Sequence, residues 1–81
     1  MSYRRQRRKL GVYAVQVVTP RGRIVTWISP QSVEQLALDW SDDPSKDDFR
    51  FIGIDKSGYE VGGWSISEVL AGWYSKDIGG K

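Results

Sequence analysis

A run of basic side chains near the start of the chain is the clearest candidate for chemistry in this sequence. Residues 3–9 read YRRQRRK, and five of them are positively charged: Arg4, Arg5, Arg7, Arg8 and Lys9. The planar guanidinium fork matches the geometry of a phosphate group, and a short basic arm can follow a groove in a polyanion. The run therefore predicts an arm that binds nucleic acid, with either DNA or RNA as the partner.

The charge of the rest of the chain bears on this prediction. The net charge is +2 and the first nine residues hold +5, so the remaining 72 residues carry −3. An acidic body is repelled by phosphate, but it can also orient the chain by staying away from the phosphate backbone. The arm resembles the arginine-rich peptides that bind structured RNA and the basic arms that enter DNA minor grooves. Runs of like charge are also common in tails that bind proteins or only keep a domain in solution.

The sequence lacks the side chains for several common kinds of catalysis. It has no cysteine and no histidine, which excludes disulfides, thiolate nucleophiles, zinc fingers and imidazole acid–base chemistry. The acidic segment of residues 41–48, SDDPSKDD, lacks the ligand spacing and the glycine of a calcium loop. No glycine-rich phosphate loop is present either. We therefore expect neither an enzyme nor a bound metal or cofactor.

Length and composition predict one small globular domain. The chain has 81 residues, of which 40% are hydrophobic and 27% charged, as in ordinary globular proteins. No apolar run approaches the roughly 20 residues of a membrane span. The basic start also lacks the apolar stretch of a secretory signal. We expect a cytoplasmic protein with no membrane partner.

A weak internal repeat predicts the fold. A shift of 36 residues places Gly22 on Gly58 and Ser29 on Ser65, and each half reads strand, turn, strand, helix. The expected halves are residues 11–40 and 49–75, joined by the acidic connector 41–48, with a disordered arm at 1–10 and a frayed tail at 77–81. The predicted fold is α+β, in the order ββαββα, with a four-stranded antiparallel sheet and two helices on one face. An alternative exchanges elements between two chains in a dimer.

Short motifs place the turns and the helix starts. The segments TPRG and DKSG put Pro or Asp early and Gly fourth, which suits a type I turn followed by a left-handed glycine. Ser29 and Pro30 predict a helix start with an N-cap and a proline at the first position. Ser65 and Glu68, in SISE, predict a capping box. Apolar residues at helical spacing then form two stripes: Val33, Leu36, Ala37, Trp40 and Ile66, Val69, Leu70, Trp73.

Alternation along the strands divides the sheet residues between two faces. The expected turns pair Val17 with Val25 and Val15 with Trp27. These side chains are expected to form the core against the helices, together with Tyr13, Phe49, Phe51, Gly53, Val61 and Gly63.

The opposite face of the predicted sheet is about half apolar, which is unusual for a face that meets water. Its stripe, expected to be exposed in a monomer, comprises Val18, Ile24, Ile52, Ile54 and Trp64. Contiguous exposed apolar surface marks partner sites, so this stripe is the candidate contact for a protein partner or a homodimer. Arg50 lies beside Trp64 in the predicted register, close enough for a cation–π contact, and joins the arm as a candidate nucleic-acid contact. The other interpretation is that the arm or the tail covers this face, or that β-branched residues lie there for their strand propensity alone.

Two functions from different classes follow from these features. The first is a small non-enzymatic regulator that binds nucleic acid through the arginine-rich arm. The alternative is a protein-binding inhibitor or adaptor that acts through the sheet face, for example on a host nucleic-acid-processing or defence complex. Small proteins with a basic arm on a compact α+β body are often regulators or inhibitors carried by phages and mobile elements, which is an association and not a physical deduction.

Overall fold

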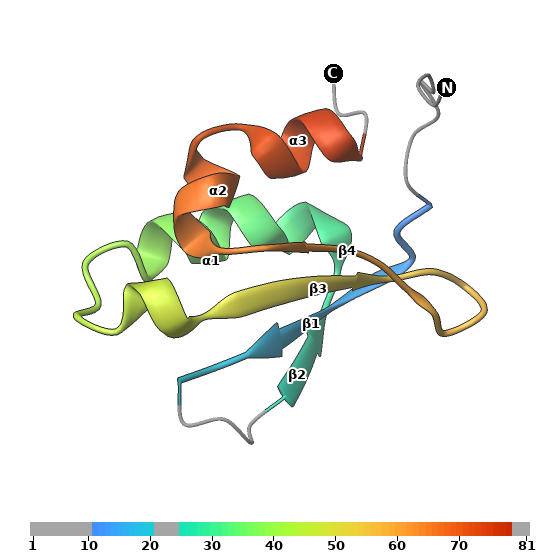
Figure 1. The fold of residues 1–81 in the computed structure, drawn as a ribbon, viewed down its shortest axis with the longest axis horizontal. Coiled ribbons are helices and arrows are strands. Elements are labelled where there is room, and N and C mark those ends of the chain that lie inside the picture. Colours follow the sequence, from blue (N-terminus) through green and yellow to red (C-terminus); the bar gives the residue numbers. More distant parts are fainter. Residues whose placement is uncertain (1–10, 21–24, 79–81) are drawn as a thin grey trace, which may run out of the picture.

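The computed structural model describes residues 11–20 and 25–78, which form one sheet covered on one side by helices (Figure 1). The strands are β1 (Ala14–Val18), β2 (Val25–Ile28), β3 (Arg50–Ile54) and β4 (Glu60–Trp64), all antiparallel in the order β2-β1-β3-β4. The helices are α1 (Val33–Asp39), α2 (Ile66–Leu70) and α3 (Trp73–Asp77). The predicted α+β fold is therefore confirmed, and the element order follows ββαββα except that the second helix is divided in two.

The two hairpins meet through their first strands. β1 pairs with β3, so that Val15 lies opposite Gly53 and Val17 opposite Phe51. The β3–β4 turn has the predicted form: Gly58 has a positive φ of 89°, and Asp55 Oδ1 accepts hydrogen bonds from the backbone N–H of Ser57 and of Tyr59, both at 2.9 Å. An aspartate that caps its own turn in this way stabilises the hairpin through local hydrogen bonds.

The core lies between the sheet and the helices. Val15, Val17 and Phe51 are buried on the helix side of the sheet, and they pack against buried side chains of all three helices, Val33, Ala37, Ile66, Val69 and Tyr74. Trp40, just past α1, stacks on Phe49 with ring centroids 4.9 Å apart. The first predicted apolar stripe is correct: Val33 and Ala37 are buried, while Leu36 and Trp40 pack against the core from its margin.

The register of the first hairpin differs from the prediction by one residue. Val25 pairs with Val18 and not with Val17. Because side chains alternate between faces, this shift turns every β2 side chain over. Ile28 thus lies beside Val15 and packs against the core, whereas Trp27 pairs with Gln16 on the other face. The placement of Trp27 in the core was wrong. The segment TPRG extends outside the described residues.

A bulge in β4 overturns the second register prediction. Ile54 pairs with Glu60 but Gly53 pairs with Gly62, so Val61 is the extra residue. Beyond the bulge Trp64 lies opposite Phe51, in the core, where it is 3% exposed. The prediction that Trp64 lies exposed beside Arg50 was wrong, because the bulge lets the large indole join the core.

At the start of β1 the sequence alternation also fails. Tyr13 is exposed, and Val12 packs against the core in its place. Val12 Cγ2 would lie 3.1 Å from a Cβ built on Gly53, so the absence of a side chain at Gly53 makes room for it. The prediction of Tyr13 in the core was therefore wrong.

The helix starts are partly as predicted. Ser65 Oγ accepts from the backbone N–H of Glu68 at 3.1 Å, and Glu68 Oε1 accepts from the N–H of Ser65 at 2.8 Å, which confirms the capping box. Pro30 opens a 3-10 turn, η1 (Pro30–Ser32), that leads into α1. Ser29 forms no side-chain cap; its Oγ lies 2.9 Å from Ser32 Oγ instead.

The second helix breaks where the prediction made it continuous. Gly72 has a φ of 93°, a left-handed conformation that ends α2 and allows α3 to begin in a new direction. The break buries Tyr74 and leaves Leu70 and Trp73 exposed. The second stripe was therefore right for Ile66 and Val69 and wrong for Leu70 and Trp73.

Candidate functional site

The side of the sheet that faces away from the helices is the candidate site, and we call it the open face (Figure 1). Its members follow from the strand registers, since directly paired residues share a face. The described members are Ala14, Gln16, Val18, Trp27, Arg50, Ile52, Ile54, Glu60 and Gly63.

A row of four residues crosses the middle of the open face. Trp27 pairs with Gln16, Gln16 with Ile52, and Ile52 with Gly63. Trp27 is 57% exposed, whereas Gln16 and Ile52 are half-buried. Gly63 adds no side chain to the row, and the atom nearest to a Cβ built there is Ile52 Cδ1 at 3.5 Å. The row therefore ends at β2 in a large aromatic ring with much of its surface free for a ligand to stack on.

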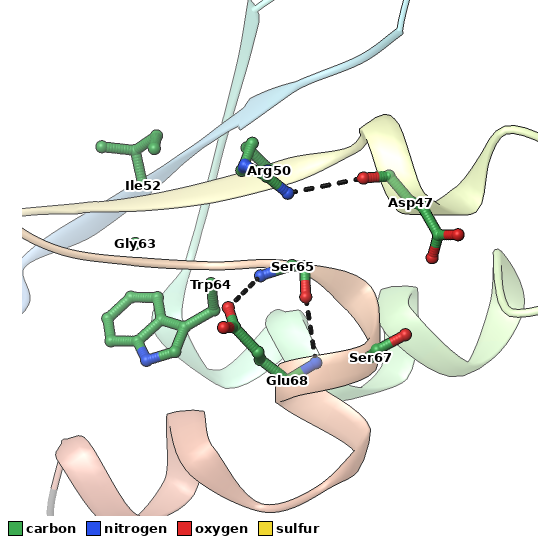
Figure 2. A pocket seen from close by; sticks show the side chains of 8 residues that line it. All are labelled: Asp47, Arg50, Ile52, Gly63, Trp64, Ser65, Ser67 and Glu68. Atoms are coloured by element: carbon green, nitrogen blue, oxygen red, sulfur yellow. Dashed lines mark hydrogen bonds between the residues drawn. The ribbon is translucent and has the colours of Figure 1, made fainter.

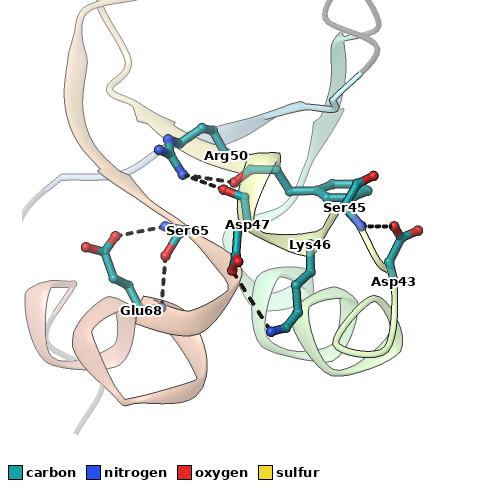
Figure 3. Close-up of polar contacts among 8 residues, drawn as sticks. Asp43, Ser45, Lys46, Asp47, Arg50, Ser65 and Glu68 are labelled. Atoms are coloured by element: carbon teal, nitrogen blue, oxygen red, sulfur yellow. Dashed lines mark hydrogen bonds and ion pairs between the residues drawn. The ribbon is translucent and has the colours of Figure 1, made fainter.

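Arg50 lies one row away on the same face, paired with Val18. Its Nη1 donates to the backbone carbonyl oxygens of Phe49 at 3.3 Å and of Asp47 at 3.5 Å (Figure 3). Among the residues that the structure describes, the one ion pair joins Lys46 to Asp47 at 4.0 Å, and Arg50 forms none. Because its partners are neutral carbonyls, the guanidinium keeps its full charge for an anionic ligand.

A pocket of about 590 Å³ adjoins Arg50 (Figure 2). It runs from the open face, at Ile52 and Gly63, to the first turn of α2, at Ser65, Ser67 and Glu68. The capping box already uses polar groups of Ser65 and Glu68, so these groups are occupied in holding the helix start. The guanidinium of Arg50 is thus the cationic group of this pocket, and the carboxylates of Asp47 and Glu68 and the hydroxyl of Ser67 lie in the same lining.

Most of the acidic residues of the domain lie outside its strands. The described residues hold all ten carboxylates of the chain but only four of its twelve basic residues, a formal charge of −6. Among the strand residues only Glu60 is acidic; the other nine carboxylates lie on the helices, the turns and the connector. Across residues 11–20 and 25–78, no group of three or more carboxylates is placed to hold a metal ion.

The predicted site residues meet this geometry to different degrees. Arg50, Val18 and Ile52 share the open face, as expected, with both aliphatic side chains half-buried. Ile54 shares the face but is only 7% exposed, so its expected exposure was wrong. Trp64 is in the core. The basic residues Arg4, Arg5, Arg7, Arg8 and Lys9, together with Ile24, lie outside the described residues.

Sequence reasoning missed Trp27, the most exposed large apolar side chain on the open face. The segment VTWI alternates equally well in either register, because Ile28 fills a core position as readily as an indole does. One feature of the sequence did indicate the correct register of β2. Ile28 lies two residues before Pro30, which opens η1, and the chain must turn toward the helix side of the sheet at that point.

Comparison of the chain with protein-family models, with curated protein sequences and with solved structures gives no match. Within the described part of the chain, no helix is both long and apolar enough to cross a membrane.

Proposed function

We propose that this chain is a small, non-enzymatic, cytoplasmic regulator that binds nucleic acid. The arm of Arg4, Arg5, Arg7, Arg8 and Lys9 binds phosphates, and the open face of the sheet turns toward the same strand. The observation that carries the proposal is the division of charge: the strands hold one carboxylate, and the helices, turns and connector hold nine.

This division bears on the main objection to nucleic-acid binding, the acidity of the body. At physiological ionic strength, charges further apart than about 8 Å are largely screened from one another. With the open face toward the phosphates, the carboxylates of α1 and α3 lie behind the sheet, whereas Glu68 of α2 and Asp47 border the pocket beside Arg50. Arg50, with no carboxylate partner, adds a cation on the face itself.

The experiment is a binding titration with labelled DNA and RNA at several salt concentrations. Five phosphate contacts from the arm give a log–log salt slope of about −4.5 on duplex DNA. We expect deletion of residues 2–9 to abolish binding and to leave the melting temperature unchanged. The matched control replaces Lys56 and Lys76, exposed cations of the body, by Gln, and should leave the slope nearly unchanged. An arm-deleted protein that binds with an unchanged slope would contradict the proposal.

A second candidate function is that of an inhibitor or adaptor that binds a protein, or a second copy of this chain, through the open face. Val18 and Ile52 favour it, because both are aliphatic and half-buried at the middle of a face that helices leave uncovered. Ile52→Glu places a charge there, and an unpaired charge in an assembled interface costs several kcal/mol. Light scattering of wild type and variant tests this candidate: assembly lost by a variant that stays folded supports it, and a monomeric wild type excludes the homodimer.

A further inference from the structure

We propose that Trp27 stacks on an unpaired base, so that the preferred ligand is single-stranded nucleic acid. This inference rests on the proposed function and specifies its ligand. Trp27 is 57% exposed on the open face, and its cross-strand neighbour Gln16 is half-buried and uncharged. Proteins that bind single strands place aromatic rings on a sheet surface, where successive bases stack on them irrespective of sequence.

Of the charged groups of the open face, Arg50 favours a nucleic acid over a protein as the occupant, and Asp47 and Glu68 border the pocket beside it. Arg50 lies two strands away and two residues along, a separation of about 12 Å from the usual strand spacing and rise. A base on Trp27 thus leaves the backbone free to pass over Val18 toward the guanidinium of Arg50. Glu60, the acidic member of the face, lies on β4 at the far edge of the sheet from Trp27.

The preference for a single strand follows from where bases are accessible. In a duplex the faces of the bases are covered by their neighbours, and an indole on a flat sheet reaches one only after unstacking it, which costs a few kcal/mol. Single strands offer exposed faces at no such cost. The arm binds phosphate in either form, so Trp27 is the feature that distinguishes them.

The chain supplies a matched control for Trp27. Trp73 is 58% exposed, almost the same fraction, but it belongs to α3 on the helix side of the domain. Its neighbours on that helix include Asp77, so a phosphate backbone near it meets a carboxylate. Loss of either indole removes a similar exposed aromatic surface, and only the loss of Trp27 should affect binding.

The experiment measures affinity for fluorescein-labelled dT15, rU15 and a 15-base-pair DNA duplex. The variants are Trp27→Ala, Trp27→Tyr and Trp73→Ala. We expect Trp27→Ala to weaken binding of the single strands about 5- to 150-fold, the range found for loss of one stacked base. Trp27→Tyr, which keeps an aromatic ring, should recover most of the affinity. Trp73→Ala should match wild type, and the duplex should respond to neither tryptophan.

Two further readouts separate stacking from a general loss of structure. The salt slope should be the same in Trp27→Ala and wild type, because no charge is removed. Bound dT15 should quench the indole fluorescence of wild type more than that of Trp27→Tyr. The fold of each variant is checked by its melting temperature. If Trp27→Ala melts at a lower temperature than wild type, the fluorescence quenching of folded Trp27→Tyr becomes the test of the stacking inference.

The outcomes distinguish this inference from the proposed function. Arm-dependent binding with equal affinities for Trp27→Ala and Trp73→Ala would overturn the stacking inference and leave the proposed function standing. The same holds if duplex binds more tightly than dT15. A wild type that binds none of the three probes overturns both. A wild type that self-associates through Trp27 and binds no probe also overturns both proposals. That result would assign the open face to a protein partner.

Discussion

The hydroxyl of Tyr74 donates a hydrogen bond to the backbone carbonyl of Pro30 at 2.6 Å, across 44 residues of sequence. The bond fastens α3 to η1 and so joins the two halves of the helix layer. The ring of Tyr74 also meets that of Trp64 edge-on, with centroids 4.8 Å apart and planes at 89°. Trp64 Nε1 in turn donates to Asp77 Oδ2 at 2.9 Å. The last helix is thus held to the sheet and to the start of α1 by two aromatic side chains with satisfied polar ends.

Removal of the Tyr74 hydroxyl should destabilise the domain modestly. Tyr74→Phe keeps the ring contact with Trp64 and leaves the Pro30 carbonyl without this donor, at a cost of about 1 kcal/mol. A domain of this size should then melt about 4–8 °C lower. The control is Tyr59→Phe, because Tyr59 is exposed, and it should melt with wild type. Equal melting temperatures for all three proteins would show that the Tyr74–Pro30 bond adds nothing to stability.

The same tyrosine makes stability depend on alkaline pH. Burial, with a smaller effect from the negative charge of Glu34, raises the pKa of Tyr74 from 10.0 to about 12. Between these values the unfolded chain has lost the phenol proton and the folded chain has kept it, so unfolding releases a proton and stability falls as pH rises. Urea unfolding of wild type should show this fall from about pH 10 to pH 12, by at most about 1.4 kcal/mol per unit. Tyr74→Phe should show a smaller fall over this range.

Core and surface aromatics should differ sharply in their effect on stability. Phe51 is fully buried between β1, β4 and the helices, and Phe51→Ala should cost about 3–5 kcal/mol. That is much of the stability that a small domain has. Trp73→Ala removes an exposed ring and should stay within about 0.5 kcal/mol of wild type. Denaturant midpoints of the two variants give the comparison, and a midpoint for Phe51→Ala near that of wild type would show the core to be wrongly described.

The two faces of β3 and β4 should tolerate an added methyl group differently. A Cβ at Gly53 would lie 3.1 Å from Val12 Cγ2 and 3.2 Å from the Trp64 ring, which Tyr74 and Asp77 hold in place. Gly53→Ala should therefore destabilise by about 1–3 kcal/mol. At Gly63, on the open face, the nearest atom is 3.5 Å away, so Gly63→Ala serves as the control and should be nearly neutral. Thermal melts of both variants are the measurement; equal melting temperatures would mean that the indole moves aside.

The parts of the fold that the sequence predicts well are those fixed by neighbouring residues. The turn at Asp55 and the capping box of Ser65 and Glu68 are closed by bonds between residues at most four apart. The failures concern choices made across the sheet. Two such choices are the extra residue Val61 in β4 and the register of β2. Each depends on which large side chain reaches the core, and the alternation of apolar residues alone does not predict that. The position of the helix break at Gly72 was also missed because it depends on packing: the break buries Tyr74 in the core and leaves Trp73 exposed.

The predictions for the candidate site were likewise right where strand pairing is regular and wrong beyond an irregularity. Arg50, Val18 and Ile52 were assigned correctly to one face because β3 pairs directly with β1, and alternation through the strand middle survives any turn. The predictions for Trp64 and Trp27 were wrong because a bulge precedes Trp64 in β4 and because the register of β2 is shifted by one residue. A buried indole had been expected where an exposed one lies, and the reverse. The function of the arm depends on charge alone, and its residues stay a prediction.

The separation of carboxylates from the open face also has a kinetic consequence. The described strands carry no net formal charge, because Arg50 offsets Glu60, whereas the helices, turns and connector carry −6, so the charge of the domain is distributed asymmetrically, as a dipole. If the chain binds a polyanion as proposed, such a dipole experiences a torque in its field, which favours approach with the strands leading. Collisions are then productive more often than random orientation allows, so the effect raises the association rate constant and leaves the lifetime of the complex to short-range contacts.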